Sequence, residues 1–122
     1  MKPVTPKQHG IIDYGFAAGL LLLPRLLKVN AKATRLYDAL ACNILAINGS
    51  TDHRVGITPL ISVKTHQKID YANLTLLYGL FVSDTINRDK KALGFHATLT
   101  GLATLNVLLT DYDKKEFKDI AK

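Results

Sequence analysis

The sequence has few of the residues that build disulfide frameworks, thiolate zinc sites or disordered linkers. Its 122 residues include one cysteine, four prolines, eight glycines and no tryptophan. A single cysteine excludes an internal disulfide framework and a zinc site made from several thiolates. Cys42 lies in an apolar run, so we expect it to be a small buried side chain. The length predicts one domain, residues 1–122, with a single core.

The common catalytic signatures are also missing. We find no nucleophile elbow, phosphate loop, zinc-protease helix or dinucleotide fingerprint, so an enzyme is the less favoured class and no catalytic residue is predicted. Lysine and arginine outnumber aspartate and glutamate by sixteen to ten, which gives a net charge of +6. These basic residues lie at the ends of apolar segments and not among aromatic residues on one face, so we expect no nucleic-acid partner.

One eight-residue pattern occurs twice. Lys7–Tyr14 and Lys64–Tyr71 share lysine, histidine, isoleucine, aspartate and tyrosine, five identities in eight positions, 57 positions apart. Later in each copy, Thr51-Asp52 returns as Thr110-Asp111. The chain is therefore predicted to contain two copies of one structural unit, at about residues 3–56 and 60–113.

Four apolar segments are predicted to be helices, because leucine, alanine and isoleucine dominate them and none alternates with a period of two. They cover about residues 11–27, 33–49, 69–82 and 92–109. Thr5-Pro6 and Ser62 are typical helix-start residues before the first and third segments. Each repeat is then a helical hairpin. The predicted fold is an all-α four-helix bundle, made from two tandem hairpins related by a pseudo-two-fold axis.

We call the first helix of each hairpin its entry helix and the second its return helix. This topology brings the starts of the two entry helices and the ends of the two return helices to one pole. The opposite pole carries mostly charged connections. Imidazole, carboxylate and phenol groups gather at the first pole, and we take them as a candidate binding site: His9, Asp13, Tyr14, Asp52, His66, Asp70, Tyr71 and Asp111.

The repeated histidine and aspartate can act in several ways. His9 and Asp13 share one helix face, as do His66 and Asp70, because each pair is four positions apart. The carboxylate can orient a histidine that handles protons. Both pairs can converge on a divalent metal such as zinc, iron or manganese. They can also simply stabilise the helix starts. A haem held by His9 and His66 is a further and less favoured option.

Other polar residues are expected to have structural roles. Tyr14 and Tyr71 resemble interfacial anchors, with an apolar ring and a wet hydroxyl. His96 faces Tyr37 of the other repeat and is expected to bond to a neighbouring helix.

Asp52 and Asp111 end helices, where the dipole disfavours a carboxylate. We therefore expect them to accept hydrogen bonds from the neighbouring entry helix, or from Lys7 and Lys64.

The apolar segments favour a membrane bundle. Residues 16–23 are apolar on all sides, whereas a helix that faces water carries charges opposite its core stripe. Residues 92–109 come nearest to the roughly 20 apolar residues of a membrane span, although the mean hydropathy of +0.10 is low. We expect a protein of the bacterial inner membrane, in contact with lipid, as a homo-oligomer or a subunit of a membrane complex. The alternative is a cytoplasmic soluble bundle that binds a metal ion or a protein partner through the His-x-x-x-Asp pairs.

A family resemblance points the same way. Pro3-x-Thr5-Pro6-x-x-His9-Gly10-x-x-Asp13-Tyr14, the run ending at Pro24, Thr51-Asp52 and Val55-Gly56-Ile57 resemble the small bacterial SPW-repeat-type membrane proteins. The resemblance covers the chain from Pro3 to about Asp111, and departs where Arg25 and Tyr78-Gly79 replace the name-giving motif. It implies tandem helix pairs in the membrane, without an assigned activity. We expect a subunit, a scaffold or a minor transport element, with a polar vestibule at one pole.

Overall fold

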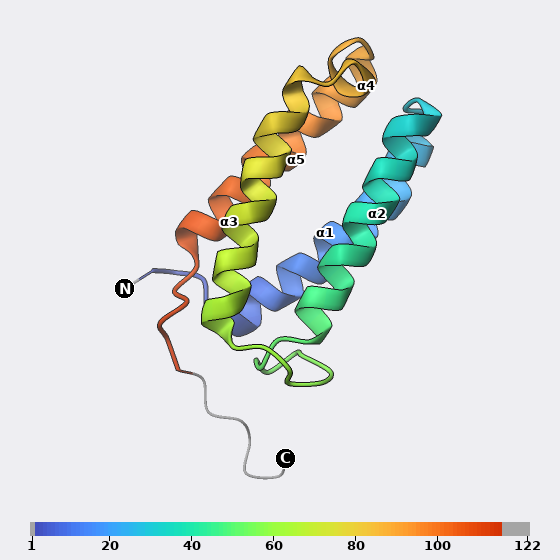
Figure 1. Ribbon diagram of the computed structural model, residues 1–122. Helices are drawn as coiled ribbons and strands as arrows, with labels where there is room; N and C mark the ends of the chain where they lie inside the picture. Colours follow the sequence, from blue (N-terminus) through green and yellow to red (C-terminus); the bar gives the residue numbers. More distant parts are fainter. Residues whose placement is uncertain (1, 116–122) are drawn as a thin grey trace.

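The computed structural model describes residues 2–115, which form an all-α arrangement (Figure 1). Four long helices account for most of it, and a single 3₁₀ turn and a one-turn helix join the third to the last. The elements are α1 (Pro6–Leu26), α2 (Ala31–Gly49), α3 (Val63–Gly79), η1 (Leu80–Val82), α4 (Asp84–Asn87) and α5 (Lys90–Leu109). The predicted fold class, all-α with four main helices, is confirmed.

The entry helices begin earlier than their apolar segments, because side-chain caps hold their polar first turns. Thr5 Oγ1 accepts a hydrogen bond from Gln8 N (3.1 Å), and Thr5 N donates to Gln8 Oε1 (2.9 Å). Ser62 Oγ accepts from Thr65 N at 3.1 Å at the start of α3. Both caps agree with the sequence prediction. As a result, the repeated histidines and aspartates lie in rigid helix and not in loops.

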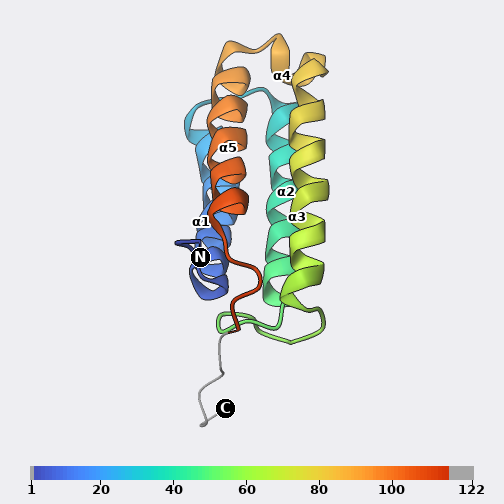
Figure 2. The ribbon, with the colours of Figure 1, turned by 90° about the vertical axis from the view of Figure 1, so that its left-hand side faces the viewer.

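The four long helices pack as two pairs, α1 with α2 and α3 with α5 (Figures 1 and 2). The starts of α1 and α3 and the ends of α2 and α5 lie at one end of the molecule, at the bottom of Figure 1, which we call the site pole. The α1–α2 turn and α4 lie at the opposite end, the far pole. The predicted gathering of helix ends is therefore present.

Polar contacts also join the pairs away from the site pole. At the far pole, Asn30 caps α2 and its Nδ2 donates to Oδ2 of Asp89, the cap of α5, at 2.9 Å. Midway along the helices, Tyr37 and His96 are both completely buried. His96 Nε2 donates to the carbonyl of Leu77 (2.7 Å), so its Nδ1 accepts from the Tyr37 hydroxyl at 2.8 Å. The predicted bond from His96 to a neighbouring helix is confirmed.

One prediction about burial is wrong. Cys42 is exposed, on the same outward side of α2 as Ala39 and Ala46. Arg35, two helical turns before Cys42, is exposed on the same side of α2, whereas the apolar residues next to Cys42 in the sequence do not share its side of the helix.

The central contact gives a test of the packing. We expect Tyr37→Phe to lower the free energy of unfolding by about 1–3 kcal/mol, because it leaves the buried His96 Nδ1 without a donor. Denaturant unfolding followed by circular dichroism measures this change. The matched control is Tyr71→Phe, at a half-exposed ring on α3, which should alter stability by less than about 0.5 kcal/mol. Equal stability of the two variants would contradict the assigned contact.

Candidate functional site

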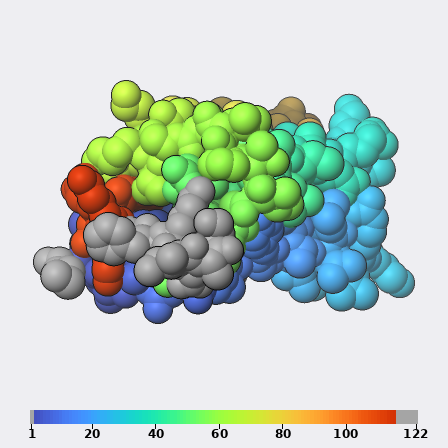
Figure 3. All heavy atoms as spheres, turned by 90° about the horizontal axis from the view of Figure 1, so that it is seen from below, coloured from blue at the N-terminus to red at the C-terminus, as the bar shows by residue number. Residues whose placement is uncertain are grey.

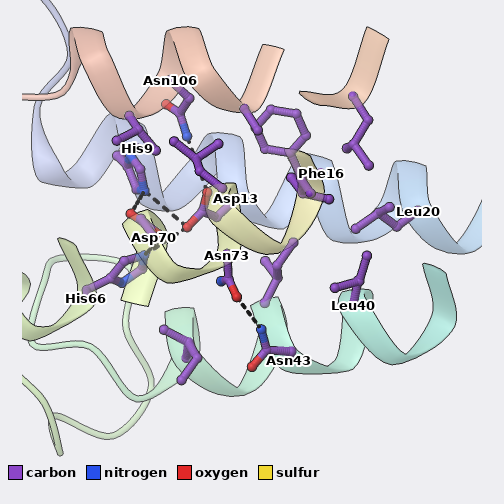
Figure 4. A pocket seen from close by; sticks show the side chains of 17 residues that line it. His9, Asp13, Phe16, Leu20, Leu40, Asn43, His66, Asp70, Asn73 and Asn106 are labelled. Carbon is purple, nitrogen blue, oxygen red and sulfur yellow. Dashed lines mark hydrogen bonds and ion pairs between the residues drawn. The ribbon is translucent and has the colours of Figure 1, made fainter. Parts of the chain in front are cut away.

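Two histidines and two aspartates meet between the pairs at the site pole (Figure 4). His9 and Asp13 come from successive turns of α1, and His66 and Asp70 come from successive turns of α3. Their donor atoms all lie within 4.8 Å of one another. We call these four residues the quartet.

The two kinds of side chain alternate around the quartet. His9 Nε2 lies 3.2 Å from Asp13 Oδ2 and 3.1 Å from Asp70 Oδ2. His66 Nε2 lies 3.1 Å from Asp13 Oδ2 and 3.3 Å from Asp70 Oδ1. Each histidine therefore contacts the aspartate of its own helix and the aspartate of the other entry helix. The imidazole rings are 3% exposed and the carboxylates 12%.

Two threonines fix the orientation of the imidazole rings. Thr110 Oγ1 lies 2.8 Å from His9 Nδ1, and Thr51 Oγ1 lies 2.6 Å from His66 Nδ1. Each threonine hydroxyl donates its own hydrogen to a backbone carbonyl one turn earlier, so it accepts from the imidazole. Nδ1 of each histidine thus carries a proton, and Nε2 is the atom turned toward the carboxylates.

Further hydrogen bonds hold the carboxylates. Asn106 Nδ2 donates to Asp13 Oδ1 at 3.3 Å, and the Tyr112 hydroxyl donates to Asp70 Oδ2 at 2.7 Å. Burial and the charge of Asp70 raise the pKa of Tyr112 well above its ordinary value, so this tyrosine stays protonated and remains a donor. All four members of the quartet therefore have a partner outside it.

The loop between α2 and α3 packs beside the quartet and depends on a glycine. Asn48 Nδ2 donates to the carbonyl of Gly10, and Asn48 Oδ1 accepts from His53 Nε2, at 2.7 and 2.8 Å. Burial lowers the pKa of His53, which is consistent with a neutral ring here. A Cβ on Gly10 would lie 2.5 Å from the side chain of Val55, so no larger residue fits without a shift of the loop. Seen from below in Figure 3, this loop and residues 110–115 lie over the site pole.

Two predicted site residues lie outside the quartet. The Tyr14 hydroxyl donates to the carbonyl of Val55 at 2.8 Å, so this tyrosine holds the loop against α1. Tyr71 is 47% exposed on α3.

The two aspartates after the return helices do not join the quartet either. Asp52 is exposed, and Asp111 accepts a hydrogen bond from the backbone N of Asp113 at 3.1 Å. Lys64 pairs with Asp113 at 2.7 Å, and not with Asp111 as expected, and this contact lowers the pKa of Asp113. The lysine prediction is wrong for this repeat, because the chain after α5 carries Asp113 closer to the start of α3.

The candidate site predicted from the sequence does not include the residues that support the quartet, namely Thr51, Thr110, Asn106 and Tyr112. A signal for two of them was present in the repeated Thr-Asp pair. The aspartate of that pair is the predicted site residue because it opposes the helix dipole, but the threonine before it contacts a histidine of the quartet in both halves.

The charge of the quartet limits its chemistry. Two buried carboxylates need two positive charges close by, because unpaired charges in a low-dielectric interior are very costly. Either two protonated imidazoles or one divalent cation between neutral imidazoles would balance them. A haem does not fit between His9 and His66, because the carboxylates lie within 3.3 Å of both Nε2 atoms where a porphyrin would be.

Comparisons with known proteins give no family for this chain. A scan against protein-family models found no match, and searches of curated proteins and of solved structures found none either. The quartet and the surface around it therefore carry the functional conclusion.

The threonines give the test of this site. We expect Thr51→Val and Thr110→Val each to lower the free energy of unfolding by about 1–3 kcal/mol, because a buried imidazole N–H loses its acceptor. Nitrogen-15 NMR of the histidines should show Nδ1–H for His9 and His66 in the wild type. Thr58→Val, at an exposed position in the α2–α3 loop, is the control and should leave both measurements unchanged. Nε2–H tautomers in the wild type would contradict the assignment.

Proposed function

We propose that this chain is a small integral membrane protein, in which two helical hairpins are joined at one pole by the quartet. The observation that carries this proposal is the outward surface of the helices, which is apolar and uncharged along its middle, while several polar side chains are buried between the helices. Water-soluble bundles carry charged side chains on the outward face of their helices instead. The proposed role is that of a scaffold or a subunit of a membrane complex.

The outward surface along the middle of three helices bears no charged side chain. Every exposed residue between positions 11 and 23, between 71 and 82 and between 93 and 109 is uncharged, and most are large and apolar. The exposed large apolar residues of these stretches are Ile11, Ile12, Leu22, Leu23, Tyr71, Leu76, Tyr78, Val82, Leu93, Leu102, Leu105, Leu108 and Leu109. A surface this apolar, extending over several helices, is typical of contact with lipid.

Several polar side chains are buried between the helices, beside an apolar core that includes Leu20 and Leu99. His96, Thr100, Asn106 and Asn48 are buried, in addition to His9, Asp13 and His66. Polar groups in membrane helices usually face the bundle interior, where they bond to one another or to the backbone.

Basic residues gather toward both ends of the helices, as expected where helices leave the hydrocarbon layer. At the far pole they include Lys28, Lys32, Arg88, Lys90 and Lys91, and at the site pole Lys7, Lys64 and Lys114. The acidic residue nearest the middle of α2, Asp38, is bound by Arg25 through two hydrogen bonds of 2.6 and 2.7 Å. Such a bidentate pair offsets the charge of both groups.

Length and composition support the proposal for one helix. Among the described helices, α5 alone is long and apolar enough to cross a membrane, with a mean hydropathy of 1.4 in its best window, most of which is exposed. The other three contain charged residues in their first turns or in the quartet. Their 17 to 21 residues still give lengths near the thickness of the hydrocarbon core, which is about 30 Å.

The repeat supports a pseudo-two-fold axis between the hairpins. Tyr37 bonds to His96 and Asn30 bonds to Asp89, and both contacts join residues 59 positions apart. At the site pole, the threonine of each half bonds to the histidine of the other. Contacts between equivalent positions are characteristic of a two-fold interface. The resemblance to SPW-repeat-type proteins implies the same arrangement and stays a prediction.

Cell fractionation tests the proposal. We expect the protein expressed in a bacterium to sediment with membranes, to resist extraction by high salt or alkaline carbonate, and to dissolve in mild detergent. Recovery in the cytosolic fraction without detergent would instead support a soluble bundle with a protein partner on its apolar surface.

A charge placed on the lipid-facing surface gives a second test. We expect Leu102→Lys on α5 to reduce membrane-inserted protein, because lysine in the middle of a spanning helix costs about 2.5–3.5 kcal/mol on insertion scales. The control is Ile57→Lys, at a highly exposed position in the loop at the site pole, which should insert normally. Immunoblots of carbonate-washed membranes measure both. Normal insertion of Leu102→Lys would argue against lipid contact at this face.

A further inference from the structure

We infer that the quartet binds one divalent transition-metal ion, for which zinc is the best match, through Nε2 of His9 and His66 and one oxygen each of Asp13 and Asp70. This inference goes beyond the membrane proposal and does not depend on it. The argument follows from the ligand distances, the orientation of the rings, the outer hydrogen bonds and the number of ligands.

The distances between the nitrogens and the carboxylate oxygens of the quartet are close to those between neighbouring ligands of one ion. Zinc lies about 2.0–2.1 Å from its nitrogen and oxygen ligands, so neighbouring ligand atoms of a tetrahedral site are about 3.3 Å apart. The four nitrogen–oxygen distances in the quartet are 3.1, 3.1, 3.2 and 3.3 Å, with Asp13 meeting both imidazoles through Oδ2 and Asp70 meeting His9 through Oδ2 and His66 through Oδ1. The ligand atoms all lie within 4.8 Å of one another, so a small adjustment of the Asp70 carboxylate brings one oxygen of each aspartate and both nitrogens around a single ion.

Hydrogen bonds alone account less well for these distances. A charged N–H donating to a carboxylate is usually about 2.7–2.9 Å from it. Nε2 can carry only one hydrogen, yet in each histidine it lies almost equally far from an oxygen of both aspartates. His9 is 2% exposed, and within the described residues its Nε2 makes no hydrogen bond. An ion at the centre would occupy both Nε2 atoms at once.

Each of the four ligands also has an outer partner of the kind found around metals. Ligating histidines usually donate their second N–H to an acceptor that fixes the ring, and ligating carboxylates are themselves hydrogen-bonded. Thr110 and Thr51 accept from Nδ1 of His9 and His66. On the carboxylate side, Asn106 binds the Asp13 oxygen that faces away from the histidines, and Tyr112 binds Asp70.

The ligand set selects the ion and its role. Calcium and magnesium prefer six or more oxygen ligands, whereas imidazole is typical of zinc, iron, copper and nickel. Four protein ligands leave no open position in a tetrahedral site, and such closed sites are structural. The ion would thus link α1 to α3 and hold the two helix pairs together. The charge of the ion, +2, would neutralise the charge of the two carboxylates.

The first experiment measures metal content. The full chain, purified in mild detergent and stripped with a chelator, should take up one Zn²⁺ per chain by elemental analysis after dialysis. Its melting temperature should rise on binding. Co²⁺ in place of zinc should give the visible absorption of a tetrahedral complex. Tight, stoichiometric binding of Mn²⁺ or Fe²⁺ with no uptake of zinc would overturn the choice of metal. No stoichiometric uptake of any of these ions by folded protein would overturn the site.

Variants locate the ion. We expect the double variant His9→Gln, His66→Gln to lose stoichiometric binding, whereas the control Asp111→Asn, at the same pole but outside the quartet, should bind like the wild type. If the double variant loses its helical circular dichroism, Thr51→Val provides the test, because it keeps all four ligands and should weaken zinc binding by about 10- to 100-fold. Unchanged affinity in Thr51→Val, or in a folded double variant, would overturn the assignment. If the protein is recovered in the cytosol, the same metal measurements are made without detergent. The membrane proposal and the metal-site proposal are therefore tested independently of each other.

Discussion

The requirement that two buried carboxylates be neutralised organises the structure. Asp13 and Asp70 reach the same small volume from different helices, and each lies within 3.3 Å of both imidazoles. This need ties the register of α1 to that of α3, because a shift of either helix by one residue would remove both its histidine and its aspartate from the volume. The caps at Thr5 and Ser62, and the close approach of the loop at Gly10, keep the two helices in that register.

Buried polar groups and an apolar outer surface occur together in this structure. Polar contacts join the pairs at both poles and at the middle, beside an apolar core that includes Leu20 and Leu99, and many other large apolar side chains face outward. In water, apolar side chains that stay exposed contribute no hydrophobic stabilisation, which is the main driving force for folding. In lipid the apolar surface has no such cost, and hydrogen bonds between helices become the interactions that specify the partner.

Much of the fold and half of the candidate site could be predicted from the sequence. The repeated His-x-x-x-Asp pattern and the caps locate the entry helices, and the hairpin topology then brings His9, Asp13, His66 and Asp70 together. The supporting residues could not be predicted. Thr51 and Thr110 lie at the ends of α2 and α5, where a difference of one residue in the helix end decides whether the threonine or the following aspartate faces inward. The outward position of Cys42 follows from the exposed Arg35 two helical turns earlier on the same side of α2, and not from the apolar residues next to Cys42 in the sequence.

The exchange of partners between the halves has a consequence for assembly. Thr51 contacts the histidine of the second half, and Thr110 contacts that of the first, so each hairpin carries an incomplete set of groups that only the other can complete. A hairpin of this kind cannot satisfy its own polar residues by folding alone. Connecting the two in a single chain places the complementary half at a high local concentration, and it turns what would be a bimolecular encounter into an intramolecular closure.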